Sequence, residues 1–119
     1  AAALLIAVGV AHSWLGERYI LTRLFRRSDL PRLFGSDQFT RRTLRFAWHL
    51  TSIAWWGFAA MLVVLALQPD MGPASWKAVA VTRWTFLASA LVALIASRGR
   101  HLSWIAFGAV AGFLWLAAP

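Results

Sequence analysis

Three histidines and a single glutamate are the side chains in this 119-residue sequence that could ligate a cofactor or carry protons. His12 lies five residues before Glu17, toward the end of the first apolar stretch. His49 lies four residues after Arg45, which places it ~6 Å into the second apolar stretch if that stretch is helical. His101 opens the last apolar stretch. The spacing therefore predicts that His12 and His49 lie at similar depth and that His101 is shallower.

These side chains are candidate ligands for a haem or a transition metal. Two histidines from different helices at matched depth can ligate a haem axially, and three ligands can hold zinc, copper or iron. The candidate set is His12, His49, His101 and Glu17. The alternative is structural, because a histidine at a helix end can hydrogen-bond a neighbouring carbonyl or lie among lipid phosphates. No local ligand spacing such as HxxxH is present, so both interpretations stay open at this point.

The elements that must position these residues are expected to be helices in a membrane. The sequence is 61% hydrophobic and 13% charged, whereas a typical soluble domain is about 25% charged. Its apolar stretches predict helices over about residues 1–22, 38–67, 75–97 and 101–118. We expect an all-α integral membrane protein, with a single transmembrane domain over residues 1–119 folded as an antiparallel four-helix transmembrane bundle.

Local signals predict where these helices end. Pro69 and Pro73 are expected to stop the second helix, and Ser75 is a candidate N-cap for the third. Gly99 suits the left-handed conformation that ends a helix, so the last two helices are expected to form an antiparallel hairpin. Arg83, inside the third helix, is expected to snorkel outward along its own aliphatic stem.

The connection between the first two helices, residues 17–45, differs in composition from the rest of the chain. It holds eight arginines and three of the four acidic residues, with apolar residues between them. We interpret it as an amphipathic connection made of two short helical segments lying on lipid headgroups. Ten of the twelve basic residues fall on one side of the four-helix topology, so that side is predicted to be cytoplasmic and both termini outside. The candidate headgroup-binding residues are Arg18, Arg42, Arg45, Arg98 and Arg100.

Small residues mark two faces on which helices could pack closely. Gly9, Ser13 and Gly16 fall on one stripe of the first helix, and Gly108 and Gly112 form a GxxxG pair in the last. Such stripes let helix backbones approach each other in a membrane. The pattern does not distinguish packing within one chain from packing between copies.

Composition also limits the compartment and the partners. The basic residues lie between apolar segments and not across a polar surface, which disfavours nucleic-acid binding. The absence of cysteine excludes disulfides and thiolate metal sites. Richness in alanine, arginine and tryptophan is typical of a bacterial inner membrane, so the lipid bilayer is the expected surrounding.

Three functional hypotheses follow from these patterns. The first is a non-enzymatic accessory or scaffold subunit that packs with itself, as a homo-oligomer, or with a larger membrane complex; no catalytic constellation in the sequence argues for an enzyme. The second is a cofactor protein that binds haem or a metal through His12 and His49, assisted by His101 or Glu17. The third is a quinone or lipid site in the inner leaflet that uses the same histidines with Arg45.

Overall fold

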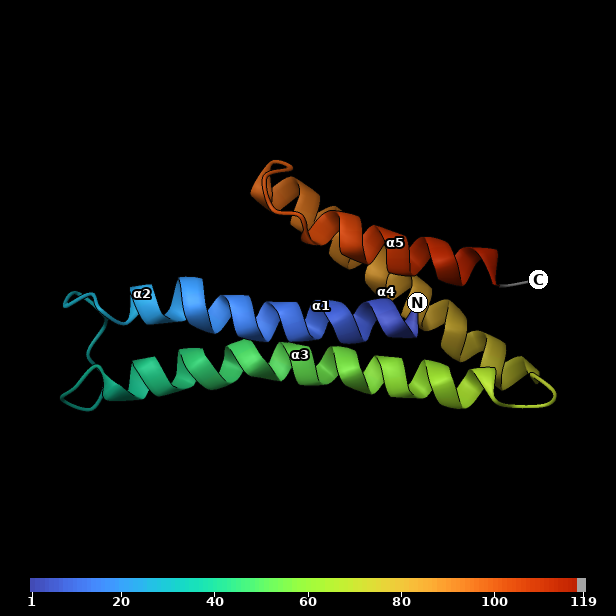
Figure 1. Cartoon of the computed structure of the whole chain (residues 1–119), viewed down its shortest axis with the longest axis horizontal. Helices are drawn as coiled ribbons and strands as arrows, with labels where there is room; N and C mark the ends of the chain where they lie inside the picture. Colours follow the sequence, from blue (N-terminus) through green and yellow to red (C-terminus); the bar gives the residue numbers. More distant parts are fainter. Residues whose placement is uncertain (118–119) are drawn as a thin grey trace. The chain divides into compact units, whose positions relative to one another are not determined.

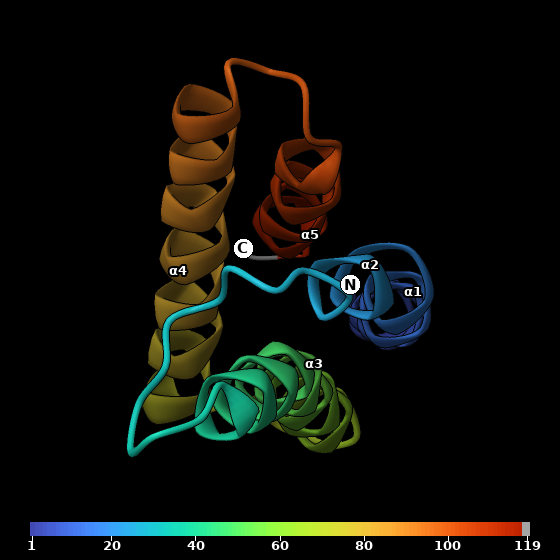
Figure 2. The same ribbon diagram turned by 90° about the vertical axis from the view of Figure 1, so that its left-hand side faces the viewer.

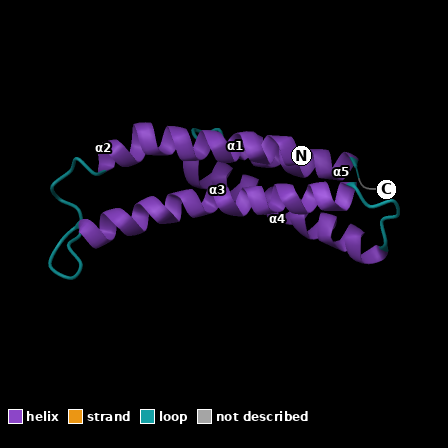
Figure 3. Ribbon diagram, turned by 60° about the horizontal axis from the view of Figure 1, so that its bottom comes forward, coloured by secondary structure: helices purple, strands orange, loops and turns teal. Residues whose placement is uncertain are grey.

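The computed structural model describes residues 1–117, and this part of the chain contains helices and loops but no strand (Figure 3). Contacts between residues divide the chain into two compact units. One, which we name the α1–α3 unit, comprises Ile6–Trp56. The other, which we name the α4–α5 unit, comprises Ala1–Leu5 together with the chain from Gly57 onward. Each unit is described by itself below.

Two long helical segments lie side by side in the α1–α3 unit (Figure 1). The first comprises α1 (Ala2–Leu15), a π-helical segment η1 (Gly16–Leu21) and the short α2 (Thr22–Leu24). The second is the beginning of α3 (Gln38–Ala66). The wider π-helical turn ends at Thr22, whose backbone N–H and hydroxyl both donate to the carbonyl of Glu17, the hydroxyl at 2.6 Å. Single π-helical turns occur frequently at functional sites, and this one contains the only glutamate of the chain.

Two tryptophans of α3 hold the α1–α3 pair together by lying over two glycines of the first segment. A Cβ added at Gly9 would overlap the indole of Trp56, and one added at Gly16 would overlap the indole of Trp48. Each indole also donates a hydrogen bond to a backbone carbonyl of α1: Trp56 to Ile6 at 3.3 Å and Trp48 to His12 at 3.0 Å. Only glycine leaves room for these rings, so the small-residue stripe of α1 serves packing inside this unit.

The connection between α2 and α3 is held mainly by arginine side chains. Arg41 donates to the backbone carbonyls of Phe25 and Arg27, and it pairs with Asp37 just before α3. Arg27 pairs with Asp29, both largely exposed. The two separate amphipathic segments expected in residues 17–45 are therefore not found as such. Their helical parts are the η1–α2 extension of α1 and the first turns of α3, and residues 25–37 lie outside any helix.

The α4–α5 unit contains a hairpin of two helices, α4 (Pro73–Ser97) and α5 (Ser103–Leu116), which lie next to each other in Figure 2. Its core is apolar and aromatic: Phe86 of α4 contacts Phe107 of α5 and Phe58 of α3 at ring-centroid distances of 5.8 and 5.5 Å. The buried residues repeat at helical spacing and are Val79, Thr82, Phe86 and Ala90 on α4, and Val110, Ala111 and Leu114 on α5.

The ends of α4 confirm one prediction and correct another. Gly99 has the expected positive φ of 75°, and Arg98 before it is also left-handed, with φ 51°. The N-cap of α4 is Gly72 and not Ser75, because Pro73 already begins the helix. Ser75 instead donates to the side chain of Gln68 at 2.8 Å.

Two helices, α3 and α4, are long and apolar enough to cross a membrane. Their bounds differ by at most two residues from the expected 38–67 and 75–97. The first segment extends to Leu24, two residues beyond the expected end, and α5 begins two residues later than expected. The α5 helix is apolar but has only 14 residues, about 21 Å at ~1.5 Å per residue. Residue 118, the expected end of the last helix, lies outside the described residues.

Candidate functional site: a hydrogen-bonded chain between α1 and α3

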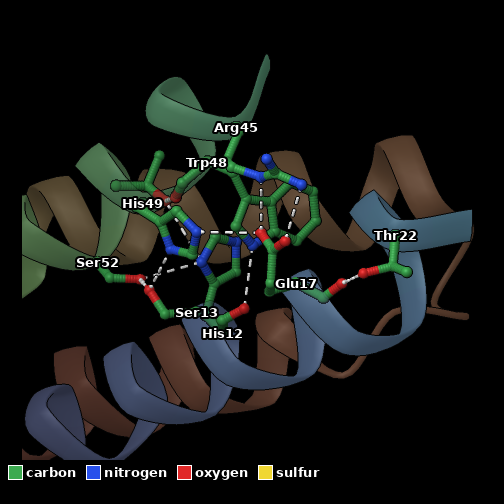
Figure 4. Close-up of polar contacts among 9 residues, drawn as sticks. His12, Ser13, Glu17, Thr22, Arg45, Trp48, His49 and Ser52 are labelled. Carbon is green, nitrogen blue, oxygen red and sulfur yellow. Dashed lines mark hydrogen bonds and ion pairs between the residues drawn. The ribbon is translucent and has the colours of Figure 1, made fainter. Parts of the chain in front are cut away.

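Polar side chains from α1, η1 and α3 point toward one another across the helix pair (Figure 4). Spacing places them on facing sides: His12, Ser13 and Glu17 lie within two turns of the first segment, and the contributing residues of α3 recur at intervals of three or four. Those α3 residues are Arg45, Trp48, His49 and Ser52.

The charged end of this chain is an ion pair. An Arg45 guanidinium nitrogen lies 3.0 Å from one oxygen of Glu17, and Nε of Arg45 donates to the other oxygen at 3.2 Å. The side chains of Arg45 and Glu17 are 52% and 37% exposed, so solvent screens the pair and its contribution to stability is small. Nε2 of His49 lies 3.4 Å from the same Glu17 carboxylate. Glu17 therefore connects an exposed arginine to a half-buried imidazole.

The centre of the chain is a pair of serines. Nδ1 of His49 lies 3.0 Å from Ser13 Oγ, and Ser13 Oγ donates to Ser52 Oγ at 2.9 Å. Ser52 Oγ in turn lies 3.1 Å from Nδ1 of His12. Ser52 is fully buried, with 0% exposure. A buried hydroxyl without a partner is costly, so these bonds fix the rotation of α1 against α3.

Hydrogen counting allows the serine pair one direction of donation at a time. A serine has one hydrogen to donate and two lone pairs to accept. If Ser13 donates to Ser52, Ser13 accepts from Nδ1 of His49; if Ser52 donates to Ser13, Ser52 accepts from Nδ1 of His12. The tautomers of the two histidines therefore decide the direction, and Nε2 of His49 faces Glu17.

The imidazole of His12 lies between aromatic rings. It stacks on the indole of Trp48 with ring centroids 4.5 Å apart and an angle of 4°, and it meets Trp55 edge-on at 4.9 Å. Thr51 Oγ1 lies 3.4 Å from Nδ1 of His12 and donates to the Trp48 carbonyl at 2.7 Å. The ring is thus held flat against an electron-rich surface, an arrangement that stabilises a positive charge.

A groove runs along the outer side of α3 beside this chain. It is shallow and open, has a volume of about 500 Å³, and is lined by Arg42, Arg45, Phe46, His49, Leu50 and Ile53. Two guanidinium groups lie toward the start of α3, and apolar side chains follow along the helix. His49 belongs both to the groove and to the hydrogen-bonded chain.

The structure brings together some of the predicted site residues. His12, His49 and Glu17 join the same hydrogen-bonded chain in the α1–α3 unit, with Ser13 inside it. The remaining candidates of this unit are placed beside the chain: Arg42 and Arg45 line the groove, Gly9 and Gly16 face tryptophans, and Arg18 lies over the rings of Trp14 and Tyr19.

Other predicted site residues belong to the α4–α5 unit. There His101 pairs with Ser103, whose hydroxyl lies 2.8 Å from Nδ1. Added Cβ atoms at Gly108 and Gly112 would meet no atom within 4 Å, so the GxxxG face is open within the described residues. The other members of the predicted set in this unit are Arg98 and Arg100. Across residues 1–117, no three or more histidine, aspartate or glutamate side chains are arranged to hold a metal ion.

Sequence reasoning missed the parts played by Trp48 and Ser52. Ser52 shares the face of α3 that carries His49, but a lone serine in an apolar helix gives no sign that it bridges two histidines. The spacing of glycines and tryptophans could have predicted this contact. Gly9 and Gly16 are seven residues apart in the first segment, and Trp48 and Trp56 are eight residues apart in α3. When two glycines on one helix and two large aromatic residues on another have similar spacing, the rings are expected to pack against the glycines.

Arg83 of the α4–α5 unit lies beside two tryptophan rings. Its guanidinium carbon lies 4.1 Å from the centroid of a Trp115 ring and 5.8 Å from that of Trp84. Its Nε is buried and has no hydrogen-bond partner among the described residues. The cation is stabilised by aromatic faces of α4 and α5.

No protein-family model matches the chain, and neither does any curated protein or solved structure.

Proposed function

We propose that the chain is a non-enzymatic accessory protein of a bacterial inner membrane whose α1–α3 unit binds an anionic lipid headgroup. In this proposal four helical segments cross the bilayer as an antiparallel bundle, and the arginine-rich connection lies on the cytoplasmic side. The finding that α3 and α4 are long and apolar enough to span a membrane supports this setting.

The observation that carries the proposal is the groove on α3. Its residues change along the helix from Arg42 and Arg45 to Phe46, Leu50 and Ile53. A phospholipid has the same order of chemistry, with a phosphate followed by acyl chains. Arg42 is exposed and lies three residues, about one helical turn, before Arg45. Both guanidinium groups can therefore reach one phosphate.

Charge favours an anionic phospholipid over a neutral amphiphile such as a quinone. The connection and the first turns of α3 carry eight arginines against three acids. Each basic residue near an anionic surface contributes about 1 kcal/mol of binding. A neutral quinone gains nothing from this excess, although His49 could hydrogen-bond to it.

The proposal is tested by lipid competition on protein reconstituted in nanodiscs that contain phosphatidylglycerol and phosphatidylcholine. Arg42→Gln is expected to lower the retention of phosphatidylglycerol, measured by native mass spectrometry, by about fivefold. The matched control is Arg23→Gln, which removes an exposed arginine outside the groove. Equal losses in the two variants would show generic attraction to the surface and contradict a defined site, and no loss in Arg42→Gln would contradict it as well.

Self-packing through α5 is a second candidate, favoured by the open face at Gly108 and Gly112. If copies pack there, Gly112→Leu should reduce the assembly size measured by light scattering in detergent. An unchanged assembly size would remove this interface. The haem and metal interpretations stay predictions, and metal analysis of gently purified protein tests them.

A further inference from the structure

We propose that His49, Ser13, Ser52 and His12 form a proton relay across the α1–α3 interface, loaded at Glu17. This inference does not depend on lipid binding by Arg42. It goes beyond a structural role for the polar residues because the contacts connect two imidazoles and one carboxylate in one series, with Thr51 as a side contact of His12.

The polar contacts run without a gap from Glu17 to His12. The contacts Glu17–His49, His49–Ser13, Ser13–Ser52 and Ser52–His12 measure 3.4, 3.0, 2.9 and 3.1 Å. Three of the four are ordinary hydrogen-bond distances, and the longest is the exposed entry. Each internal member has one group that accepts and another that donates, which a proton relay requires.

The relay also needs a single direction of donation. It requires that His49 donate from Nδ1 to Ser13, that Ser13 donate to Ser52, and that Ser52 donate to Nδ1 of His12, so that all donors point from His49 toward His12. A proton can then pass from α3 to α1 by transfer of one hydrogen between each pair of neighbouring groups. No side chain has to move from one helix to the other.

The transfer balances in protons and charge. A protonated Glu17 gives its hydrogen to Nε2 of His49, while the Nδ1 hydrogen of His49 passes to Ser13. The Ser13 hydrogen passes to Ser52, and the Ser52 hydrogen forms a new N–H bond at His12. One proton has then moved from Glu17 to His12, and both serines are neutral again. Rotation of the two hydroxyls and reorientation of the His49 ring restore the starting arrangement.

Each of the two charges that this transfer creates has a neighbour of suitable chemistry. The Glu17 carboxylate lies 3.0 Å from the oppositely charged Arg45 guanidinium. The imidazolium at His12 lies flat on the indole of Trp48, which favours a cation. The charged groups near His49 in this unit are Glu17 and Arg45, which form an ion pair, and Arg42, which lines the same groove.

The wild-type protein gives the first test, because the relay requires opposite tautomers in its two histidines. Solid-state NMR of protein with ¹⁵N-labelled histidine in lipid should find the hydrogen of His49 on Nδ1 and that of neutral His12 on Nε2. The resonances are assigned with His49→Gln and His12→Gln. Hydrogens on Nε2 of both rings would overturn the proposal, because no donor would then supply the serines.

The second test is kinetic. An imidazolium in contact with an indole quenches its fluorescence, so a pH jump should produce a signal that His12→Gln abolishes. Ser13→Ala and Ser52→Ala are each expected to slow this signal on the order of 100-fold. Ser89→Ala, which removes a hydroxyl bonded within α4, is the matched control and should leave the rate unchanged.

Retention of the final amplitude separates a broken relay from a broken fold. The serine variants should reach the wild-type end point more slowly, and circular dichroism should show wild-type helix content. Wild-type rates in both Ser13→Ala and Ser52→Ala would overturn the proposal. Absence of any His12-dependent signal in the wild type would overturn it too, because His12 would then receive no proton.

Discussion

The α1–α3 and α4–α5 units use the same residue types in opposite ways. In the first, Ser13 and Ser52 bond to each other across two helices. In the second, the α4 hydroxyls bond back to carbonyls four residues earlier in their own helix, as Thr82 does to Ala78 at 2.9 Å. The same pattern holds for Thr85, Ser89 and Ser97. A hydroxyl that bonds within its own helix does not fix how that helix packs on a neighbour. Among the described residues, the serine hydroxyls that bond from one helix to another belong to the α1–α3 unit.

Glycine and tryptophan show the same contrast. Gly9 and Gly16 are covered by indoles of α3, whereas Gly108 and Gly112 of α5 face open space within the described residues. Trp48 of α3 donates to a backbone carbonyl and stacks on His12, whereas Trp84 of α4 meets Trp115 edge-on at 5.5 Å. The contrast indicates that one pair of helices is fixed in rotation by directional contacts, and that the other is packed mainly by apolar and aromatic surfaces.

Substitution of the two kinds of glycine should give the largest difference between the units. Gly16→Leu drives a side chain into the indole of Trp48 and is expected to lower the free energy of unfolding by about 3 kcal/mol. Gly112→Leu enters open space and is expected to change it by no more than about 0.5 kcal/mol, since leucine also favours the helix. Denaturant unfolding in detergent, followed by circular dichroism, measures both. Equal losses would remove the distinction between the covered and open faces.

The sequence predicted helix positions well because long apolar runs between turn residues leave few alternatives. The bounds of α3 and α4 follow from such runs and from Pro69, Pro73 and Gly99. The π-helical segment at Gly16–Leu21 was not predictable, because its side chains suit an ordinary helix equally well. The four-span bundle and its orientation stay predictions, since within residues 1–117 two helices, α3 and α4, have the length and composition to span.

Spacing predicted the positions of the candidate residues along the helix axes. It could not predict which way each side chain faces around its helix. Spacing placed His12 and His49 at one level, and they do join one hydrogen-bonded chain. The same reasoning could not decide between the Gly9–Gly16 stripe and the Gly108–Gly112 pair, because both present small residues at helical spacing. That choice depends on the rings of Trp48 and Trp56, which are neighbours of the glycines only in space.

Removal of the indole nitrogen should give the next largest effect. Trp48→Phe loses the donor to the His12 carbonyl and part of the stacked surface, and is expected to cost about 1.5 kcal/mol of unfolding free energy. Trp84→Phe, at a half-exposed ring, is expected to cost about 0.5 kcal/mol. The same unfolding assay compares the two variants. A larger loss of unfolding free energy in Trp84→Phe than in Trp48→Phe would contradict the view that directional contacts stabilise the α1–α3 unit more than the α4–α5 unit.

Serine substitution sharpens the comparison at the level of a single hydroxyl. Ser52→Ala leaves Ser13 and His12 without their shared partner and is expected to cost about 1 kcal/mol, in the range of hydrogen bonds between membrane helices. Ser89→Ala removes a bond inside α4 and is expected to lie within about 0.3 kcal/mol of the wild type. Ser13→Ala combined with Ser52→Ala should cost less than the sum of the two, because they share one bond. Strict additivity in that double variant would argue against a connected chain.

The smallest effect is expected at the exposed ion pair of the connection, Arg27 with Asp29. The hydrogen bond from Arg27 lowers the pKa of Asp29 to about 2, compared with ~3.9 in an unfolded chain. A lowered pKa means that the pair stabilises the connection above pH ~4 and loses this effect as the pH falls through about 2.

Arg27→Gln should therefore raise the pKa of Asp29 toward its ordinary value, as measured by ¹³C NMR of the carboxyl carbon. Arg26→Gln is the matched control and should leave that pKa unchanged, because the hydrogen bonds to Asp29 come from Arg27. Since both members of the pair are largely exposed, the unfolding midpoint of Arg27→Gln at neutral pH should equal that of the wild type. A clear fall in that midpoint would mean that the connection, and not the buried serines and indoles, fixes how α1 and α3 pack.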